Sequence, residues 1–108
     1  MINDMIIAIP ASADKTDALI DERFGRCPFF CFYDTRTGNH NFQKNSMKDA
    51  GGGVGLQVAE FLSNKGVDEV CAVEVGPKAE GVLNRLKIKI NPVESGQTVA
   101  KIINVLNY

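Results

Sequence analysis

Residues 21–34 hold side chains that could bind a metal or an anion. The segment reads DERFGRCPFFCFYD and places two arginines and two cysteines next to a run of aromatic residues. A guanidinium group forms paired hydrogen bonds with anions. A cysteine thiolate is a soft ligand that suits copper and iron-sulfur clusters. Binding of a metal cluster or another polyanion is therefore the first chemistry to consider for this chain.

The three cysteines differ in their surroundings along the sequence. If the chain from Cys27 to Cys31 is extended, the two residues lie roughly 13 Å apart, too far to hold one ion together. Cys31 lies inside the aromatic run and Cys71 inside EVCAVEV, so both are interpreted as buried core residues. Cys27 is flanked by Arg23 and Arg26, which are expected to lower its pKa and favour the thiolate. Cys27 is the candidate metal ligand.

An anion could also be held without a covalent ligand. Arg23 and Arg26 would supply two guanidinium groups, and Gly51, Gly52 and Gly53 would supply backbone N–H groups at the start of a helix. These five residues are the candidate cofactor-binding set. The alternative is that both segments are a solvated loop and a flexible helix entry.

The sequence gives little support to catalysis. Counted from Gly51, the sixth position is Leu56, so the spacing of a dinucleotide-binding motif is absent, and no Gly-Lys-Ser/Thr triplet follows as in a P-loop. Cys27 and His40 lack a third residue to orient the imidazole, and His40 lies in a polar segment where it is expected to be solvated. Glu74 is interpreted as a strand end. The prediction is a protein that is not an enzyme.

Composition sets the class of protein. The 108 residues are 44% hydrophobic, which suits one domain spanning residues 1–108. Twelve basic and thirteen acidic residues give a net charge of −1, so neither nucleic acid nor a membrane surface is an expected partner. Three cysteines without a secretion leader favour a cytoplasmic protein with free thiols.

Periodicity predicts the elements that must position the candidate site. Residues 5–9 form a short apolar run that Pro10 is expected to end, which is typical of a strand buried on both faces. Thr98 is expected to cap the last helix, and Pro77 to lie in the first turn of the one before it. The predicted strands are 5–9, 29–34, 39–45, 69–75 and 87–91, and the predicted helices are 54–65, 76–86 and 98–106.

This order predicts an α/β fold, β-β-β-α-β-α-β-α, with a mixed sheet and helices on its faces. Residues 29–45 form a hairpin, and 87–91 is a lysine-bearing edge strand. In such sheets ligands bind outside the carboxyl ends of the parallel strands, where the strand order reverses. That edge would gather the loop after Ile9, the glycine run and the Gly76-Pro77 turn.

The run RFGRCPFFCFYD, together with the later AGGGVGLQVAEFLSNKGVDEV and the Gly-Pro turn, resembles the dinitrogenase iron-molybdenum cofactor biosynthesis family. That family includes NifX-like carriers and orange-protein-like cluster binders. The resemblance implies a ribonuclease-H-like fold and a non-enzymatic carrier of an anionic metal cluster or an iron-molybdenum-type precursor. The implied cofactor is an iron-sulfur, iron-molybdenum or molybdenum-copper cluster, and the implied partner is a cofactor-assembly protein.

Two positions depart from the family pattern. Many members have a histidine where this chain has Arg23, and many have one in the glycine-rich loop, which here reads GGGVG. Two alternatives to a cluster carrier therefore stay open. One is an interaction or regulatory module of the same fold that has lost the cluster, and the other is a phosphate binder that uses only the glycine turn.

Overall fold

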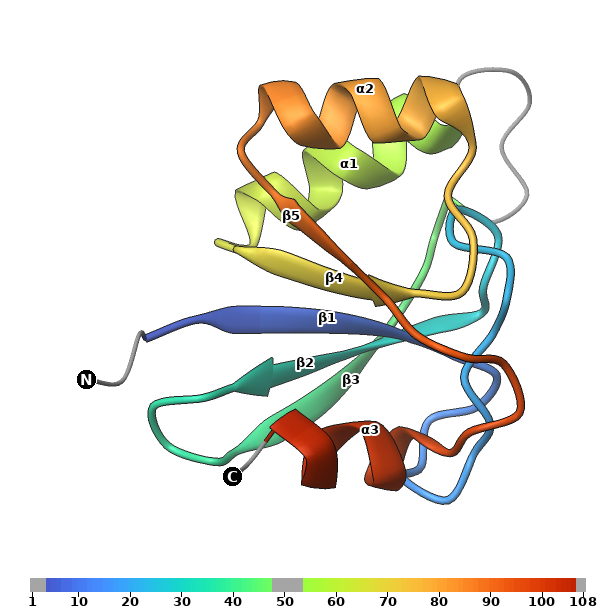
Figure 1. Ribbon diagram of the computed structural model, residues 1–108, viewed down its shortest axis with the longest axis vertical. Helices are drawn as coiled ribbons and strands as arrows, with labels where there is room; N and C mark the ends of the chain where they lie inside the picture. The colour runs from blue at the N-terminus through green and yellow to red at the C-terminus, as the bar shows by residue number, and fades with distance from the viewer. Residues whose placement is uncertain (1–3, 48–53, 107–108) are drawn as a thin grey trace.

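A five-stranded mixed sheet of order β3-β2-β1-β4-β5 forms the centre of the protein (Figure 1). The computed structural model describes residues 4–47 and 54–106. The predicted order of elements and the mixed sheet are confirmed, and β3 and β5 lie at the two edges. The elements are β1 (Ile6–Ala11), β2 (Phe29–Asp34), β3 (His40–Lys44), α1 (Val54–Asn64), β4 (Glu69–Ala72), α2 (Pro77–Arg85), β5 (Lys89–Pro92) and α3 (Val99–Leu106).

The strand order reverses next to β1. β1 pairs antiparallel with β2 on one side, where Ile9 faces Cys31, and parallel with β4 on the other, where Ala8 faces Val70. The chain leaves β1 toward β2, forms the β2–β3 hairpin, and crosses through α1 to reach β4. The carboxyl ends of β1 and β4 therefore lie at one edge, which is the usual ligand position in such sheets.

Each face of the sheet has its own hydrophobic core. Figure 1 shows α1 and α2 on one face and α3 on the other. Because strand side chains alternate between faces, Ala8 packs under α1 and α2, whereas Ile7 and Ile9 pack under α3. Leu62 of α1 is fully buried on the first face, as is Val99 of α3 on the second.

The predicted helix boundaries follow from local chemistry. The Thr98 hydroxyl oxygen accepts a hydrogen bond from the Lys101 N–H at 3.1 Å, which is the expected N-cap of α3. Gly66 follows α1 with a φ of +76°, a conformation that glycine adopts without strain. Pro77 lies in the first turn of α2, where its missing N–H leaves no helical bond unmade.

Several boundaries differ from the prediction: β5, for example, begins at Lys89 and not at residue 87. The differences in β1 and β4 follow from strand pairing. Pro10 does not end β1, because pairing with β2 continues through Pro10 and Ala11, whereas β4 pairs only with Ile7 and Ala8. The proline thus lies beyond the part of the strand that both neighbours share. β4 ends at Ala72, three residues earlier than predicted, because its pairing with β5 stops there.

The long segment after β1 is attached to the rest of the protein. Ala11 forms an antiparallel bridge with Ile20, and Leu19 forms one with Thr98 at the start of α3. Ser12 donates a hydrogen bond from its hydroxyl to the Leu19 carbonyl at 2.9 Å. This segment therefore presents residues 21–28 in a fixed place. Within the described part of the chain, no helix is long and apolar enough to cross a membrane.

Candidate functional site

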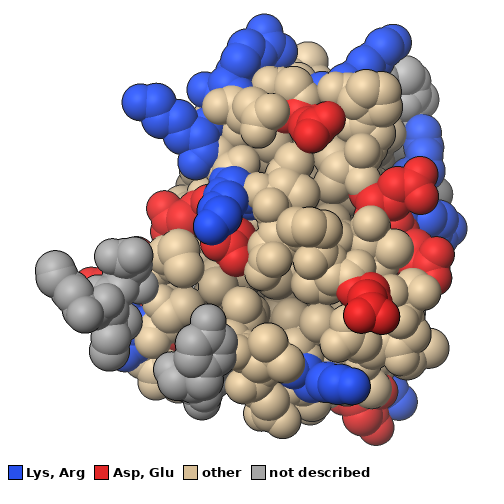
Figure 2. Space-filling view, viewed as in Figure 1, with Lys and Arg blue, Asp and Glu red and all other residues tan. Residues whose placement is uncertain are grey.

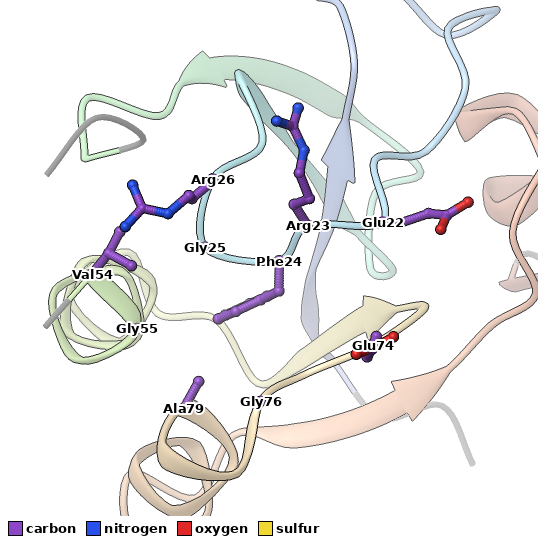
Figure 3. A pocket seen from close by; sticks show the side chains of 10 residues that line it. All are labelled: Glu22, Arg23, Phe24, Gly25, Arg26, Val54, Gly55, Glu74, Gly76 and Ala79. Carbon is purple, nitrogen blue, oxygen red and sulfur yellow. The ribbon is translucent and has the colours of Figure 1, made fainter. Parts of the chain in front are cut away.

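A cavity of 440 Å³ lies at the carboxyl ends of β1 and β4 (Figure 3). Its walls come from the loop before β2, the first turn of α1, and the turn that leads from β4 into α2. The lining residues are Glu22, Arg23, Phe24, Gly25, Arg26, Val54, Gly55, Glu74, Gly76 and Ala79. Both arginines of the predicted site are among them.

Two helices begin at this cavity. Val54 and Gly55 open α1, while Gly76 is the N-cap of α2 and Ala79 lies in its first turn. A Cβ atom on Gly55 would lie 3.0 Å from the Ala79 Cβ, so the absence of a side chain lets the two helix starts pack closely. The first turn of a helix has N–H groups without helical partners and a partial positive charge. Two such ends side by side favour an anion.

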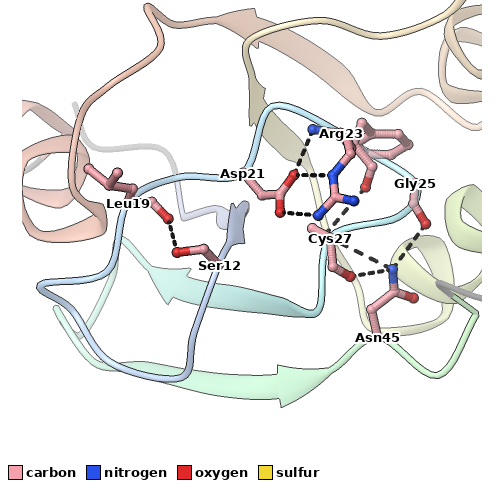
Figure 4. A network of polar contacts seen from close by, with 8 residues as sticks. Ser12, Leu19, Asp21, Arg23, Gly25, Cys27 and Asn45 are labelled. Carbon is pink, nitrogen blue, oxygen red and sulfur yellow. Dashed lines mark hydrogen bonds and ion pairs between the residues drawn. The ribbon is translucent and has the colours of Figure 1, made fainter.

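The Arg23 guanidinium is already held by a carboxylate (Figure 4). Its Nε and Nη2 atoms donate to the two oxygens of Asp21 at 3.1 and 2.9 Å, and its backbone N–H donates to Asp21 at 2.8 Å. The Asp21 side chain is only 8% exposed, against 68% for Arg23. In Figure 3 the Arg23 side chain points away from the starts of α1 and α2. A ligand would have to compete with Asp21 for this guanidinium.

This pairing also fixes the charge on Asp21. Burial alone would raise the pKa of the Asp21 carboxyl, but the hydrogen bonds and charge of Arg23 outweigh burial and lower that pKa below its usual value. The Asp21 carboxylate in turn raises the pKa of Arg23. Both groups are therefore charged at neutral pH.

Two carboxylates that the sequence did not indicate also line the cavity. Glu74 was interpreted as a strand end, yet it forms a parallel bridge with Arg23 and lines the cavity with it. Glu22 lines it as well, and Figure 3 shows Glu22 and Arg26 directed to opposite sides. Arg26 extends toward Val54 at the start of α1, so the positive charge lies near the helix ends. The cavity has a positive and a negative side.

The prediction that the Cys27 thiol has a lowered pKa is wrong. The residue is fully buried and does not line the cavity. Its Sγ donates a hydrogen bond to the Phe24 carbonyl at 3.4 Å. Burial raises the pKa of the Cys27 thiol to about 12, and the nearby Asp21 charge adds to the rise, so the flanking arginines do not favour the thiolate. Metal binding by Cys27 stays a prediction, and it would require the loop to open.

Asn45 is a buried polar residue that the sequence analysis did not predict. Its side-chain N–H groups donate to the carbonyls of Gly25 and Cys27 at 3.0 and 2.9 Å (Figure 4). Its side-chain oxygen accepts a hydrogen bond from the Met47 N–H at 3.1 Å. These bonds attach residues 22–27, which we call the arginine loop, to the end of β3. An asparagine directly after a polar strand gave no signal of this role in the sequence.

Comparison with known proteins identifies the family. A family profile described as "Dinitrogenase iron-molybdenum cofactor" matches residues 5–107. The chain belongs to this family. An uncharacterized protein of Methanocaldococcus jannaschii is 29% identical over 89 residues, which cover 80% of this chain and 72% of that protein.

Two solved structures extend the family comparison. The apo form of the orange protein from Desulfovibrio gigas has a TM-score of 0.89 and 28% identity, covering 98% of this chain and 89% of that one. A candidate NifB protein from Thermotoga, assigned to the DUF35 family, has a TM-score of 0.81 and 32% identity, covering 94% and 86%. The sheet and helices of this chain thus match those of both proteins.

In this member of the family, the other cysteines and the histidine lie where the sequence analysis placed them. Cys31 and Cys71 are buried in the core, as predicted, and His40 is exposed on β3. Among residues 4–47 and 54–106, no group of three or more His, Cys, Asp or Glu side chains is placed to hold a metal ion. Gly51, Gly52 and Gly53 lie outside the described residues, so their role in binding stays a prediction.

Proposed function

We propose that the protein is a non-enzymatic carrier that holds an anionic metal cluster or an iron-molybdenum-type precursor in the cavity between residues 22–26 and the starts of α1 and α2. Iron-sulfur, iron-molybdenum and molybdenum-copper clusters are the candidate cargo. Membership of the dinitrogenase iron-molybdenum cofactor family supports this class of ligand. The carrier would exchange its cargo with a cofactor-assembly protein in the cytoplasm, where the three free thiols would stay reduced.

The observation that carries the proposal is the meeting of two helix starts and an arginine loop at one cavity. Neither helix start has an acidic residue in the lining, since Val54, Gly55, Gly76 and Ala79 are all uncharged. Arg26 lies on the same side. Backbone N–H groups and a guanidinium can hold an anion by hydrogen bonds alone, so no thiolate is required.

The Asp21–Arg23 pair gives the carrier a means of releasing its cargo. When an anion enters, the Arg23 guanidinium can leave Asp21 and bind the anion. When the anion leaves, Arg23 can pair with Asp21 again. A bidentate pair between two charged groups is among the stronger polar contacts in proteins. Because this pair must break first, the affinity of the site for the anion is lower than it would be if Arg23 had no carboxylate partner. A carrier that must pass on its cargo benefits from moderate affinity.

The test is a titration of anaerobically purified apo protein with tetrathiomolybdate, followed by absorption spectroscopy and calorimetry. A second arm offers iron and sulfide under reducing conditions. We expect uptake of one anion per chain, weakened roughly tenfold in Arg26→Ala, because a charge-assisted hydrogen bond contributes about 1.5–3 kcal/mol.

Arg36→Ala is the matched control. It removes the same charge, but Arg36 follows β2 at the opposite end of the sheet. There its Nη2 atom lies 3.7 Å from the Asp34 Oδ2 atom. Absence of uptake in both arms, or equal weakening in the two variants, would refute the proposal. Cys27→Ala should leave tetrathiomolybdate uptake unchanged, and a loss there would instead support the thiolate as a ligand.

The second candidate is an interaction or regulatory module that has lost the cluster. It is favoured by the carboxylates of Glu22 and Glu74, which oppose an anion in the cavity, and by the Asp21 carboxylate that already occupies Arg23. Under this hypothesis the native protein takes up no cluster. Glu74→Gln then separates the two candidates, because it should strengthen tetrathiomolybdate binding only if the cavity is where the anion binds.

A further inference from the structure

A second hollow lies along α1 and α2, next to the cavity. This groove has a volume of 780 Å³ and a mostly apolar lining. It shares the lining residues Val54 and Gly55 with the cavity, so the two hollows are adjacent. At its other end Leu56 and Val82 also line a smaller hollow of 310 Å³ that reaches Leu86. The groove therefore follows both helices from the candidate site outward.

The α2 side of the groove is one continuous stripe of the helix. Lys78, Gly81, Val82 and Arg85 are spaced i, i+3, i+4 and i+7, which places them on one face. The buried face of α2 is formed by other positions, Ala79 and Leu83 among them. α2 thus has a second, solvent-facing stripe with an apolar centre.

The α1 wall of the groove and the end of α2 add exposed apolar surface. The Leu56 side chain is 46% exposed on α1, and Leu86, just after α2, is 37% exposed. Single exposed leucines are common, but Leu56 lines both the groove and the smaller hollow that Leu86 also lines. The two leucines thus belong to one apolar patch that a binding partner could cover.

Among the described residues, nothing packs against Gly81 closely enough to require a glycine there. It lies in the middle of α2, where glycine destabilises a helix relative to alanine. A Cβ atom added there would have no described heavy atom within 4 Å, unlike Gly55, whose missing side chain permits helix packing. The missing side chain leaves open space on this stripe of α2, where a second helix could approach the backbone closely.

The charges at the groove indicate the kind of partner. Lys78 and Arg85 stand at the two ends of the α2 stripe, and none of the described residues that line the 780 Å³ groove carries a carboxylate. Figure 2 shows Lys and Arg side chains projecting from the upper edge of the molecule, over α2. Glu60 appears only in the smaller hollow. An acidic partner is therefore complementary to the groove.

We infer that this groove is the docking site for an amphipathic helix of a partner protein, with an apolar stripe flanked by acidic residues and a small residue where the helix passes Gly81. Grooves between two helices commonly bind a third helix in this way. The shared residues Val54 and Gly55 would bring the partner to the mouth of the cavity. The biological reason for docking there, exchange of cargo, rests on the proposed function, but the binding itself does not.

The experiment uses the apo protein and a designed helical peptide of about 14 residues, long enough to cover the roughly 14 Å length of α2. The peptide has a leucine stripe with a central alanine and flanking glutamates. A second peptide has the same stripe with lysines in place of glutamates. Binding is measured by calorimetry and mapped by NMR on labelled protein. We expect the acidic peptide to bind at least tenfold more tightly, more weakly at high salt, and to shift the amide signals of residues 78–85.

Gly81→Leu tests the close approach directly. It should reduce acidic-peptide binding at least tenfold, whereas Asn84→Leu adds the same side chain to an exposed position of α2 outside the groove and should not. Gly81→Leu should fold because nothing described lies within 4 Å of an added Cβ there, and Asn84→Leu should fold because Asn84 is exposed. Circular dichroism checks this.

Several results would overturn the inference. They are binding of neither peptide, equal binding of both, or equal effects of the two leucine variants. Concentration-dependent dimerisation that Gly81→Leu abolishes would assign the groove to a second copy of this chain instead. Because the protein is free of metal in these measurements, a failure leaves the tetrathiomolybdate result, and with it the proposed function, to be judged separately.

Discussion

The buried thiols predict a loss of stability in mild alkali. Burial raises the pKa of Cys27, Cys31 and Cys71 to about 12, against an ordinary value of 9.0. Between these values the unfolded chain gives up the thiol protons and the folded chain keeps them, so the stabilisation is complete below pH 9 and declines as the pH rises toward 12. One pKa unit corresponds to about 1.4 kcal/mol, so each thiol removes about 1.4 kcal/mol between pH 8 and pH 10. The three together remove about 4 kcal/mol, a large part of the roughly 5–15 kcal/mol that stabilises a typical domain.

Urea unfolding at pH 8, 9 and 10 with a non-thiol reductant measures this loss. Other groups titrate in the same range, but they are common to the native protein and to Cys27→Ala, so the difference between the two isolates one thiol. The variant should lose about 1.4 kcal/mol less than the native protein between pH 8 and pH 10. Equal losses would refute the reasoning. They would mean that the folded protein tolerates the Cys27 thiolate, and would strengthen the prediction that Cys27 is a metal ligand.

Three further predictions concern stability. Gly81→Ala should stabilise the protein by about 0.5–1 kcal/mol through helix propensity, whereas Gly55→Ala should destabilise it by about 1 kcal/mol or more, because its Cβ would lie 3.0 Å from that of Ala79. Thermal denaturation of both variants checks this, and shifts of the same sign would contradict the packing argument. Thr98→Ala should lower the free energy of unfolding by about 1 kcal/mol through loss of the N-cap, measured in urea. Because Arg23 lowers the pKa of Asp21, the stabilisation is present above its usual value of 3.8 and is lost as the pH falls below it. Asp21→Asn should therefore show a shallower decline in stability across an acid titration followed by circular dichroism, and an unchanged slope would argue against the pairing.

The order of elements could be predicted because each element shows its own pattern. The apolar run at 5–9 and the aromatic run at 29–34 pair as the two central antiparallel strands, and the 3.6-residue period from Val54 marks α1. Boundaries depended on long-range pairing instead. β4 ends where β5 stops pairing with it, and β1 continues past Pro10 because only one neighbour pairs there. The residues near the ends of β1 and β4 do not by themselves indicate where either strand ends.

The candidate site was only partly predictable for the same reason. Arg23 and Arg26 lie in a recognisable segment and do line the cavity. Neighbouring arginines suggested a reactive Cys27, but the direction of a side chain at a strand entrance decides whether a thiol meets solvent or the core. Glu74 lines the cavity beside Arg23, with which it forms a bridge although the two are about fifty residues apart in sequence. Charge balance in a site is a property of the fold, and the sequence does not display it.

The contact between Gly55 and Ala79 bears on how large a cargo this fold could accept. Both residues lie in the first turns of the helices whose ends form one wall of the cavity. Their separation is set by two of the smallest side chains available, so the width between the helix ends is near its minimum. Enlarging either residue would spread the ends and widen the opening while leaving every charged group in place. The size and the charge of an anion that the cavity could accept would thus be governed by different residues, and each could change in evolution or by design without the other.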